Sequence, residues 1–523
     1  MRVISLVFVL VCSLCSFAQE IDVLHYNYAI NLNDHDDTIK GAALITLIKK
    51  SDKQTIALDL GGVNKDGKGM TVTVAIGKET SHYTHNADQL NIDLAKHKKG
   101  DTLQLAVTYK GVPADGLVIS KNKYGDRTFF ADNWPNRAHF WIPCKDIPND
   151  KASFEFTVTA PSQYKVISNG KLIEEKELGS GKKLTHWTED TPLSTKVMVI
   201  GVAKFAIKEF ADSPPNIPVS AWVYENDSTK GFHDYAPAPE ILKFFSSYIA
   251  PYPYEKLANV QSKTIFGGME NASAIFYFEN SVTGKGGVED LLAHEIAHQW
   301  FGDMASEKSF THLWLSEGFA TYFTDIYWQH KYGEEAFKKR LQKERNEVIQ
   351  FVKTTDHPVV DSLSGYMDLL NPNSYQKGAW ILHMLRIEVG DSVFHNIIRA
   401  YYQQYKGSNA NTREFEAVAE KVSGKDLKWF FDQWLYRPGI PKLNPTWKTD
   451  GNEIKVEIKQ TGSQSFQLPL QIGILSADGK MTIQKLSIKS KEEEFKIETS
   501  FKPAKLVLDP NTNLLFEGTV TIK

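Results

Sequence analysis

The segment LLAHEIAHQWFGD, residues 291–303, has the most informative spacing in the chain. Its two histidines, His294 and His298, are four residues apart, so on a helix both imidazoles leave the same face and can bind one zinc ion. Glu295 lies beside them, where it can activate an attacking water. The pattern H-E-x-x-H also occurs by chance, and the alternative is two histidines on an exposed helix face.

The rest of this helix favours a metal site over the alternative. Its other positions are apolar: Leu291, Leu292, Ile296, Ala297, Trp300 and Phe301. They predict a buried helix, in which unpaired imidazoles and a carboxylate are costly without a partner. Eighteen residues separate His298 from Glu317 in HLWLSEGFATYF, with Gly302 between them, so a second helix can return antiparallel with a third ligand. We expect one zinc ion on His294, His298 and Glu317, with the fourth position left to water.

Other histidines lack this spacing. We interpret His139, His312, His330, His383 and His395 as packing or surface residues.

A second informative segment is FGGMENASAIFY, residues 266–277. Gly267 and Gly268 have no side chains, so a substrate backbone can run alongside as an added strand. Glu270 then offers a carboxylate that can pair with a free substrate α-ammonium. The alternative is a Gly-Gly turn followed by a surface glutamate.

The hydrophobic pattern changes twice along the chain. Period-two alternation up to residue 209 predicts an antiparallel β domain over 19–209, and helical periodicity then predicts a mainly helical domain over 210–440. Alternation returns after Arg437-Pro438-Gly439, with a hairpin expected at Asp478-Gly479, and predicts a β-sandwich over 441–523.

Composition excludes two classes of protein. The chain has 523 residues, of which 42% are hydrophobic and 24% charged, and its net charge is -3. These values are not those of a disordered chain, and they lack the basic surplus of a nucleic-acid binder, so we expect no nucleic-acid partner.

The N-terminus resembles an export signal. Arg2 precedes an apolar run over 3–12, and small residues at Ser16 and Ala18 suit cleavage before Gln19. A membrane anchor is the alternative, but the run is shorter than the roughly 20 apolar residues that cross a bilayer. We therefore predict a signal peptide over 1–18, no stable membrane anchor after its cleavage, and a periplasmic or secreted protein.

Several motifs together resemble peptidase family M1, the gluzincin aminopeptidases related to aminopeptidase N. They are GGMEN at 267–271, HEIAH at 294–298 and WLSEGFATYF at 314–323, joined by the Pro143-Cys144 pair and SYQKGAW at 374–380. The resemblance covers most of the chain that follows the predicted signal.

The resemblance implies a role for each matching residue. His294, His298 and Glu317 look like the family's zinc ligands, and Glu295 looks like its general base. Glu270 looks like the glutamate that anchors the substrate amine. Tyr375 looks like the tyrosine that donates a hydrogen bond to the oxyanion; without the resemblance, a core tyrosine is the simpler interpretation.

One position departs from that family. Many members have a second amine-binding Glu or Gln ahead of the Pro-Cys pair, but counting back from Pro143 leads to Trp134, in ADNWPNRAHFWIPC. Asp132 or Asn133 could take that role, and the sequence leaves both open. The pocket for the cleaved residue is expected around Met269 and the first domain.

These observations predict a zinc aminopeptidase with an N-terminal β domain, a thermolysin-like helical catalytic domain and a C-terminal β-sandwich. The expected substrates are peptides with a free N-terminus. A zinc endopeptidase with the same ligands and a non-catalytic scaffold are the rival hypotheses. Glu270 disfavours the first rival, and the presence of three ligands and a base disfavours the second.

Overall fold

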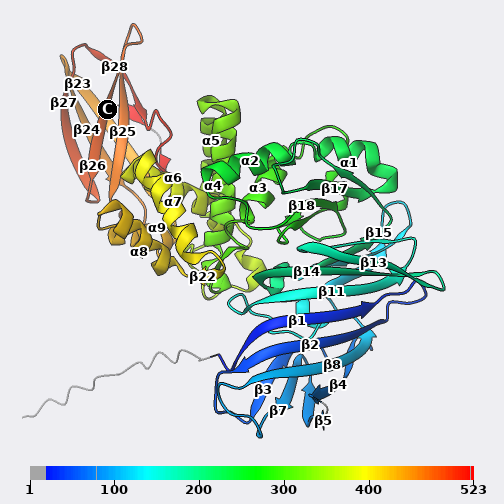
Figure 1. The fold of residues 1–523 in the computed structure, drawn as a ribbon. Coiled ribbons are helices and arrows are strands. Elements are labelled where there is room, and N and C mark those ends of the chain that lie inside the picture. The colour runs from blue at the N-terminus through cyan, green and yellow to red at the C-terminus, as the bar shows by residue number, and fades with distance from the viewer. Residues whose placement is uncertain (1–18, 78, 519, 523) are drawn as a thin grey trace, which may run out of the picture.

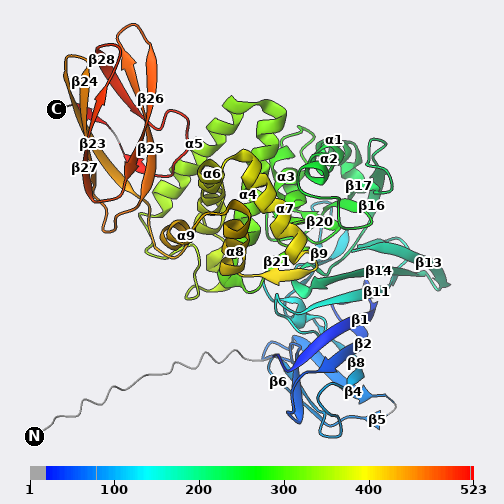
Figure 2. The same ribbon diagram turned by 60° about the vertical axis from the view of Figure 1, so that its left-hand side comes forward.

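The computed structural model describes residues 19–77, 79–518 and 520–522, so the predicted signal peptide over 1–18 lies outside the described residues. Three bodies follow one another along the molecule (Figures 1 and 2). A β-rich body carries the N-terminal part, a largely helical body lies in the middle, and a second β body lies at the far side of the helices. This order confirms the predicted three-part fold class.

The largest sheet of the N-terminal body has eight strands in the order β13-β14-β11-β1-β2-β8-β4-β5. β1 and β11 run parallel, whereas their other neighbours in the sheet are antiparallel. Buried residues alternate with partly exposed ones along β11, so one face of the sheet packs on the core. The strands are β1 Ile21–Asn31, β2 Ile39–Lys49, β4 Gly69–Ile76, β5 Glu79–Thr80, β8 Thr102–Val112, β11 Lys151–Pro161, β13 Lys171–Gly179 and β14 Lys182–Ser194.

Two smaller sheets complete this body. One has the order β3-β7-β6, with β3 Thr55–Asp59, β6 Tyr83–Asn86 and β7 Gln89–Asp93. The other has the order β12-β15-β10-β9, with β9 Leu117–Lys121, β10 Arg127–Ala131, β12 Lys165–Ser168 and β15 Ile200–Ala203. The chain leaves β10 directly into Asp132, Asn133 and Trp134, which brings these three residues to the boundary with the middle body.

A mixed sheet opens the middle body, and sequence periodicity did not reveal it. Its order is β16-β17-β18-β20-β19, with β16 Phe205–Glu209, β17 Val219–Tyr224, β18 Leu257–Gln261, β19 Gly268–Met269 and β20 Ala274–Tyr277. β18 and β20 are buried along their whole length, so they lack the alternation that marks a half-exposed strand. The predicted limit between residues 209 and 210 falls between β16 and β17, which pair with each other.

Helices make up most of the middle body. They are α1 Ser228–Asp234, α2 Ala238–Tyr248, α3 Glu289–His298, α4 Trp314–Tyr332, α5 Glu334–Phe351, α6 Gly378–Val389, α7 Asp391–Tyr405, α8 Thr412–Ser423 and α9 Lys428–Leu435. A short pair of parallel strands, β21 Ala305–Glu307 and β22 Ser408–Ala410, joins two distant parts of this body. α8 ends at Gly424, which adopts a left-handed conformation with φ 67° and separates it from α9.

The C-terminal body consists of two sheets, as predicted for a sandwich. One contains β27-β24-β23-β29, with β30 also paired to β23, and the other contains β26-β25-β28. Their bounds are β23 Lys442–Asp450, β24 Glu453–Gln460, β25 Leu468–Ser476, β26 Met481–Ile488, β27 Glu492–Glu498, β28 Pro503–Leu508, β29 Glu517–Gly518 and β30 Thr521–Ile522. β25 and β26 are joined at Gly479, where φ is 88°, so the predicted hairpin at Asp478-Gly479 is confirmed.

Buried polar contacts hold the first two bodies together. The Lys196 ammonium lies 2.6 Å from the Glu307 carboxylate, and both side chains are nearly inaccessible. The Asn169 amide donates to the carbonyl of Ala272 at 2.6 Å. Because buried polar groups that lose a partner are costly, these contacts fix the relative position of the two bodies. None of the helices in the described ranges is long and apolar enough to cross a bilayer.

Candidate active site

α3 and α4 bring three potential metal ligands to one point. His294 and His298 lie one turn apart on α3, and their Nε2 atoms are 3.1 Å from each other. The Glu317 carboxylate, in the first turn of α4, has its Oε2 3.3 Å from the Nε2 of His294 and 3.2 Å from the Nε2 of His298. Among the residues that the structure describes, these three form the only group of His, Cys, Asp or Glu with such convergence.

The spacing of these atoms fits a single zinc ion. Ligands bound tetrahedrally at about 2.0–2.1 Å are separated from one another by about 3.3 Å. The three measured separations, between 3.1 and 3.3 Å, are close to that value. Two imidazoles and one carboxylate are also the donors of known catalytic zinc sites, so the residues present fit the ion that the sequence predicts.

The surroundings of His298 set the orientation of its ring. Its Nδ1 lies 3.1 Å from the carbonyl oxygen of Phe301, which can only accept a hydrogen bond. A proton on Nδ1 satisfies this carbonyl, and Nε2 is then the nitrogen that faces His294 and Glu317. The Ser316 hydroxyl, also 3.1 Å from Nδ1, comes from the residue preceding Glu317 and ties α4 to this imidazole.

Two glycines let α4 and α6 approach closely enough to converge on the site. A Cβ on Gly318 would lie 2.8 Å from the Cα of Gly378, so no side chain fits between the two backbones. Glu317 directly precedes the first glycine, and Tyr375 lies three residues before the second. The contact thus places a predicted ligand and a predicted oxyanion donor on neighbouring segments.

Glu295 follows His294 on α3 and is 4% exposed. A Cβ on Gly268 would come within 2.2 Å of its Oε1, so the edge strand β19 can lie against this carboxylate only because residue 268 is glycine. Burial raises the pKa of the Glu295 carboxyl well above its usual range, and the carboxylates of Glu270 and Glu317 add to the rise. A divalent cation among the ligands opposes that rise.

Glu270 follows β19 directly and is 5% exposed. Its carboxylate forms no hydrogen bond or ion pair with the described part of the chain. Its backbone is held firmly: the Gln299 side chain donates from Nε2 to the Glu270 carbonyl at 2.7 Å and accepts at Oε1 from the Ser273 N–H at 2.7 Å. Gln299 is the residue after His298, so one buried amide ties the predicted amine-anchoring loop to the end of the metal-binding helix.

Tyr375 lies in a π-helical turn, Asn373–Lys377, immediately before α6. Its ring stacks on that of His294, with centroids 5.9 Å apart and an interplanar angle of 15°. Burial raises the pKa of the Tyr375 phenol well above its usual value, and the negative charges of the Glu317, Glu270 and Glu295 carboxylates add to this rise. The phenol therefore keeps its proton and can donate a hydrogen bond into the site.

A cavity of about 240 Å³ joins these groups. Its walls include all the predicted substrate-binding residues, Gly267, Gly268, Met269 and Glu270, together with His294, Glu295, Glu317 and Tyr375. The structure thus brings most of the sequence-predicted site residues to one cavity. His298 does not line this cavity, but its Nε2 lies close to the other two ligands. The binding roles of the four residues at 267–270 stay predictions.

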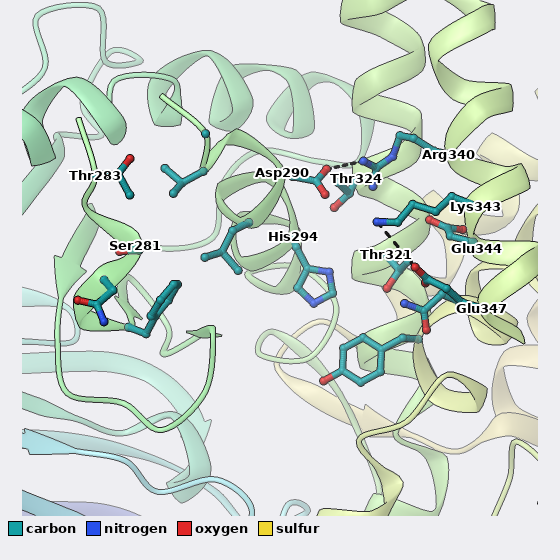
Figure 3. Close-up of a pocket in the computed structure, with 17 residues that line it drawn as sticks. Ser281, Thr283, Asp290, His294, Thr321, Thr324, Arg340, Lys343, Glu344 and Glu347 are labelled. Atoms are coloured by element: carbon teal, nitrogen blue, oxygen red, sulfur yellow. Dashed lines mark hydrogen bonds and ion pairs between the residues drawn. The ribbon is translucent and has the colours of Figure 1, made fainter. Parts of the chain in front are cut away.

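A second, larger cavity of about 530 Å³ shares Leu291, His294 and Tyr375 with the first. Figure 3 shows His294 in its middle, with Ser281 and Thr283 on one side and side chains of α5 on the other. Arg340 from α5 is paired with Asp290 at 2.5 Å, and Lys343 lies 3.7 Å from Glu347. The two cavities meet at His294, one of the three ligands, and Glu270 lines only the smaller one.

Neither residue considered as a second amine-binding group reaches the smaller cavity. The Asp132 carboxylate accepts from the N–H of Ile265 and lies 3.1 Å from the Arg137 guanidinium, and Asn133 donates to the carbonyls of Thr195 and Met198. Trp134 lines the cavity instead. The position reached by counting back from Pro143 therefore does face the site, but with an indole in place of a polar group.

The five other histidines singled out in the sequence have structural partners, as predicted. His139 pairs with Asp146, His312 contacts the Thr412 hydroxyl, and His395 lies 2.6 Å from the Tyr248 carbonyl. His330 stacks on Phe244, and His383 lies 3.0 Å from the Tyr322 hydroxyl.

Sequence reasoning missed several parts of the site. Phe266, Leu291 and Leu370 line the smaller cavity, and Gln299 fixes its anchoring loop. Phe266 and Leu291 are the first residues of the two quoted segments. A single apolar residue does not indicate by its type whether it lines a cavity or packs in the core. Leu370 comes from a loop far along the chain, and only folding brings it to the wall.

The fold and the three-ligand cluster are those of a metallopeptidase-type catalytic domain joined to β-rich domains. Residues 234–434 match the profile of the peptidase family M1 domain, and residues 23–197 match that of the peptidase M1 N-terminal domain. The chain belongs to peptidase family M1.

Known proteins with related sequences or folds agree with this family. "Probable aminopeptidase 2" of Sulfurisphaera tokodaii is 30% identical over 395 residues, which is 71% of this chain and 50% of that protein. "Aminopeptidase M1-C" of Oryza sativa subsp. japonica is 28% identical over 376 residues, 68% of this chain and 42% of the relative. The chain therefore spans about half of these relatives or less.

A solved structure shares the fold. Legionella pneumophila aminopeptidase A, crystallised with aspartic acid, superposes with a TM-score of 0.83 at 18% sequence identity. The match covers 96% of this chain and 60% of the other. At this identity the likeness concerns the fold alone.

Proposed function

We propose that this protein is a zinc aminopeptidase that removes the N-terminal residue from peptides. The observation that carries the proposal is the place of Glu270. Its carboxylate lines the same small cavity as His294, Glu317 and Glu295, and no described side chain forms a hydrogen bond or ion pair with it. A buried carboxylate without an ion-pair partner is stabilised by a bound cation. The α-ammonium of a peptide is the cation that an aminopeptidase must bind.

The residues around the cavity supply the rest of the chemistry. When bound by the three ligands, zinc would polarise the scissile carbonyl and lower the pKa of water. Glu295 is placed to take the proton of the attacking water and to return it to the leaving nitrogen. Tyr375 donates its phenolic hydrogen to the carbonyl oxygen as that oxygen gains negative charge.

The two cavities give a peptide a direction. The ammonium binds at Glu270 in the smaller cavity, and the scissile bond then lies at the three ligands, of which His294 lines both cavities. The residues after that bond extend into the larger cavity between Thr283 and α5 (Figure 3).

The proposal is tested by comparing leucyl-7-amido-4-methylcoumarin with its N-acetyl derivative. Because acetylation removes the charge that Glu270 would bind, we expect kcat/KM to fall by about 10²-fold or more. Equal cleavage of the two substrates contradicts the aminopeptidase and supports the rival endopeptidase. No cleavage of either, by protein shown to hold one zinc per chain, supports a non-catalytic scaffold.

The variant Glu270→Ala tests the same contact from the protein side. We expect kcat/KM for the free-amine substrate to fall by about 10²-fold, with the zinc content unchanged. Glu335→Ala is the matched control, because Glu335 is an exposed glutamate of α5 outside both cavities. Equal effects of the two substitutions contradict the proposed role of Glu270.

We also propose that the chain is exported, on the basis of Arg2, the apolar run over 3–12 and the small residues before Gln19. Cell fractionation with N-terminal sequencing tests this, and an intact Met1 on the soluble protein contradicts it.

A further inference from the structure

The smaller cavity has an apolar side that the proposed chemistry does not use. Its polar lining groups all have assigned roles in binding the amine, holding the metal or moving protons. The remaining lining side chains form what we call the apolar wall: Trp134, Phe266, Met269, Leu291 and Leu370. Within the part of the chain that the structure describes, no lysine, arginine, aspartate or amide side chain lines this cavity. A substrate side chain placed there meets only hydrocarbon and aromatic surface.

The indole of Trp134 is a fixed part of this wall. It is 2% exposed and makes edge contacts with the rings of Phe266 and Phe310, at 5.7 and 5.6 Å between centroids. The nearby Arg137 guanidinium lies over the Phe266 ring, but it is paired with Asp115 and Asp132 and does not line the cavity. The part of the wall around Trp134 is therefore preformed, and ordering it costs little free energy on binding.

The size of the cavity limits what can enter. Its volume of about 240 Å³ is below the roughly 300–1,000 Å³ of pockets that enclose drug-sized ligands. With the amine at Glu270 and the carbonyl at the three ligands, as in the proposed function, the cavity has room for one amino-acid residue. The side chain of that residue must then lie against the apolar wall.

We propose that the apolar wall selects peptides whose first residue is large and apolar, such as leucine, methionine or phenylalanine. The inference rests on the proposed function and specifies its substrate class. Burial of an apolar side chain is favourable in proportion to its area, so alanine gains less than leucine. An acidic or basic first residue would bury a second charge without a partner, which the wall cannot offset.

A panel of aminoacyl-7-amido-4-methylcoumarins measures this selectivity on the zinc-loaded protein. We expect kcat/KM for the leucyl, methionyl and phenylalanyl substrates to exceed that for the alanyl one by about 10-fold. Their kcat/KM should exceed that for the glutamyl and arginyl substrates by about 10²-fold or more. Cleavage of all substrates at similar rates overturns the selectivity alone. Absence of cleavage across the panel overturns the aminopeptidase activity and the selectivity with it.

A charge placed on the wall should change the preference. Leu370 is half-buried at the cavity, so Leu370→Arg gives a glutamyl side chain a partner, and we expect the ratio of glutamyl to leucyl kcat/KM to rise at least 10-fold. Leu363→Arg is the matched control, because Leu363 lies on the same loop, is 85% exposed and lines neither cavity. An unchanged ratio in folded Leu370→Arg protein, or the same change in both variants, overturns the proposal.

Discussion

The two sides of the catalytic cavity are built in different ways. The metal side comes from two consecutive helices, and its three ligands lie within residues 294–317. The apolar wall comes from segments between Trp134 and Leu370 and from two bodies of the molecule, and its Leu291 lies on α3, the helix that carries two of the ligands. The metal side sets what reaction is possible, while the wall and Glu270 set which peptide undergoes it. A short motif can therefore reveal the chemistry of this protein without revealing its substrate.

The sharpest test of the metal side is Glu295→Gln. The amide keeps the shape of the carboxylate but cannot take a proton, so we expect kcat to fall by about 10³-fold or more. Zinc binding should persist at one ion per chain, measured by elemental analysis, because Glu295 is not among the converging ligands. Substantial activity in this variant would show that another group acts as the base.

Tyr375 lies where the two sides meet, and Tyr375→Phe removes only its hydroxyl. The stacked ring on His294 can remain, so we expect KM to change little while kcat falls by about 10²-fold. Steady-state kinetics with the leucyl substrate measure both constants. An unchanged kcat would show that Tyr375 only packs in the core and does not act on the oxyanion.

The smallest expected effect concerns Gln299, which links the two sides. In Gln299→Leu the Glu270 carbonyl and the Ser273 N–H lose their partner, so the anchoring loop loosens beside an intact metal cluster. We expect KM for free-amine substrates to rise about 10-fold with kcat changed less and zinc retained.

Gln433→Leu provides the control for that variant. Gln433 is also buried, and its amide likewise donates to and accepts from backbone groups, those of Gln467, far from the cavity. We expect it to lower the melting temperature without changing KM. If both variants lower stability alike and neither raises KM, Gln299 has only a structural role.

Local patterns predicted much of the fold. Alternation identified the β bodies at both ends, and the sandwich and its hairpin at Asp478-Gly479 are present as expected. The mixed sheet of the middle body was not predicted, because β18 and β20 are buried on both faces and short. The parallel pairing of β1 with β11 was not predicted either, since periodicity does not say which strands become neighbours.

The sequence by itself determined which three side chains converge as potential metal ligands. His294 and His298 share a helix face because of a four-residue spacing, and Glu317 follows within one helix–helix connection, so local geometry is sufficient. It also placed Glu270 near that cluster, through a motif whose match to a known family could be recognised.

Only the tertiary structure decided what surrounds the cluster. Trp134 reaches the cavity because the N-terminal body packs on the middle one, while Asp132 and Asn133, its neighbours in sequence, turn to buried backbone partners. Gly318 and Gly378 bring Tyr375 towards Glu317 through a contact between residues that are distant in sequence. Such contacts depend on the packing of whole elements, and no local spacing encodes them.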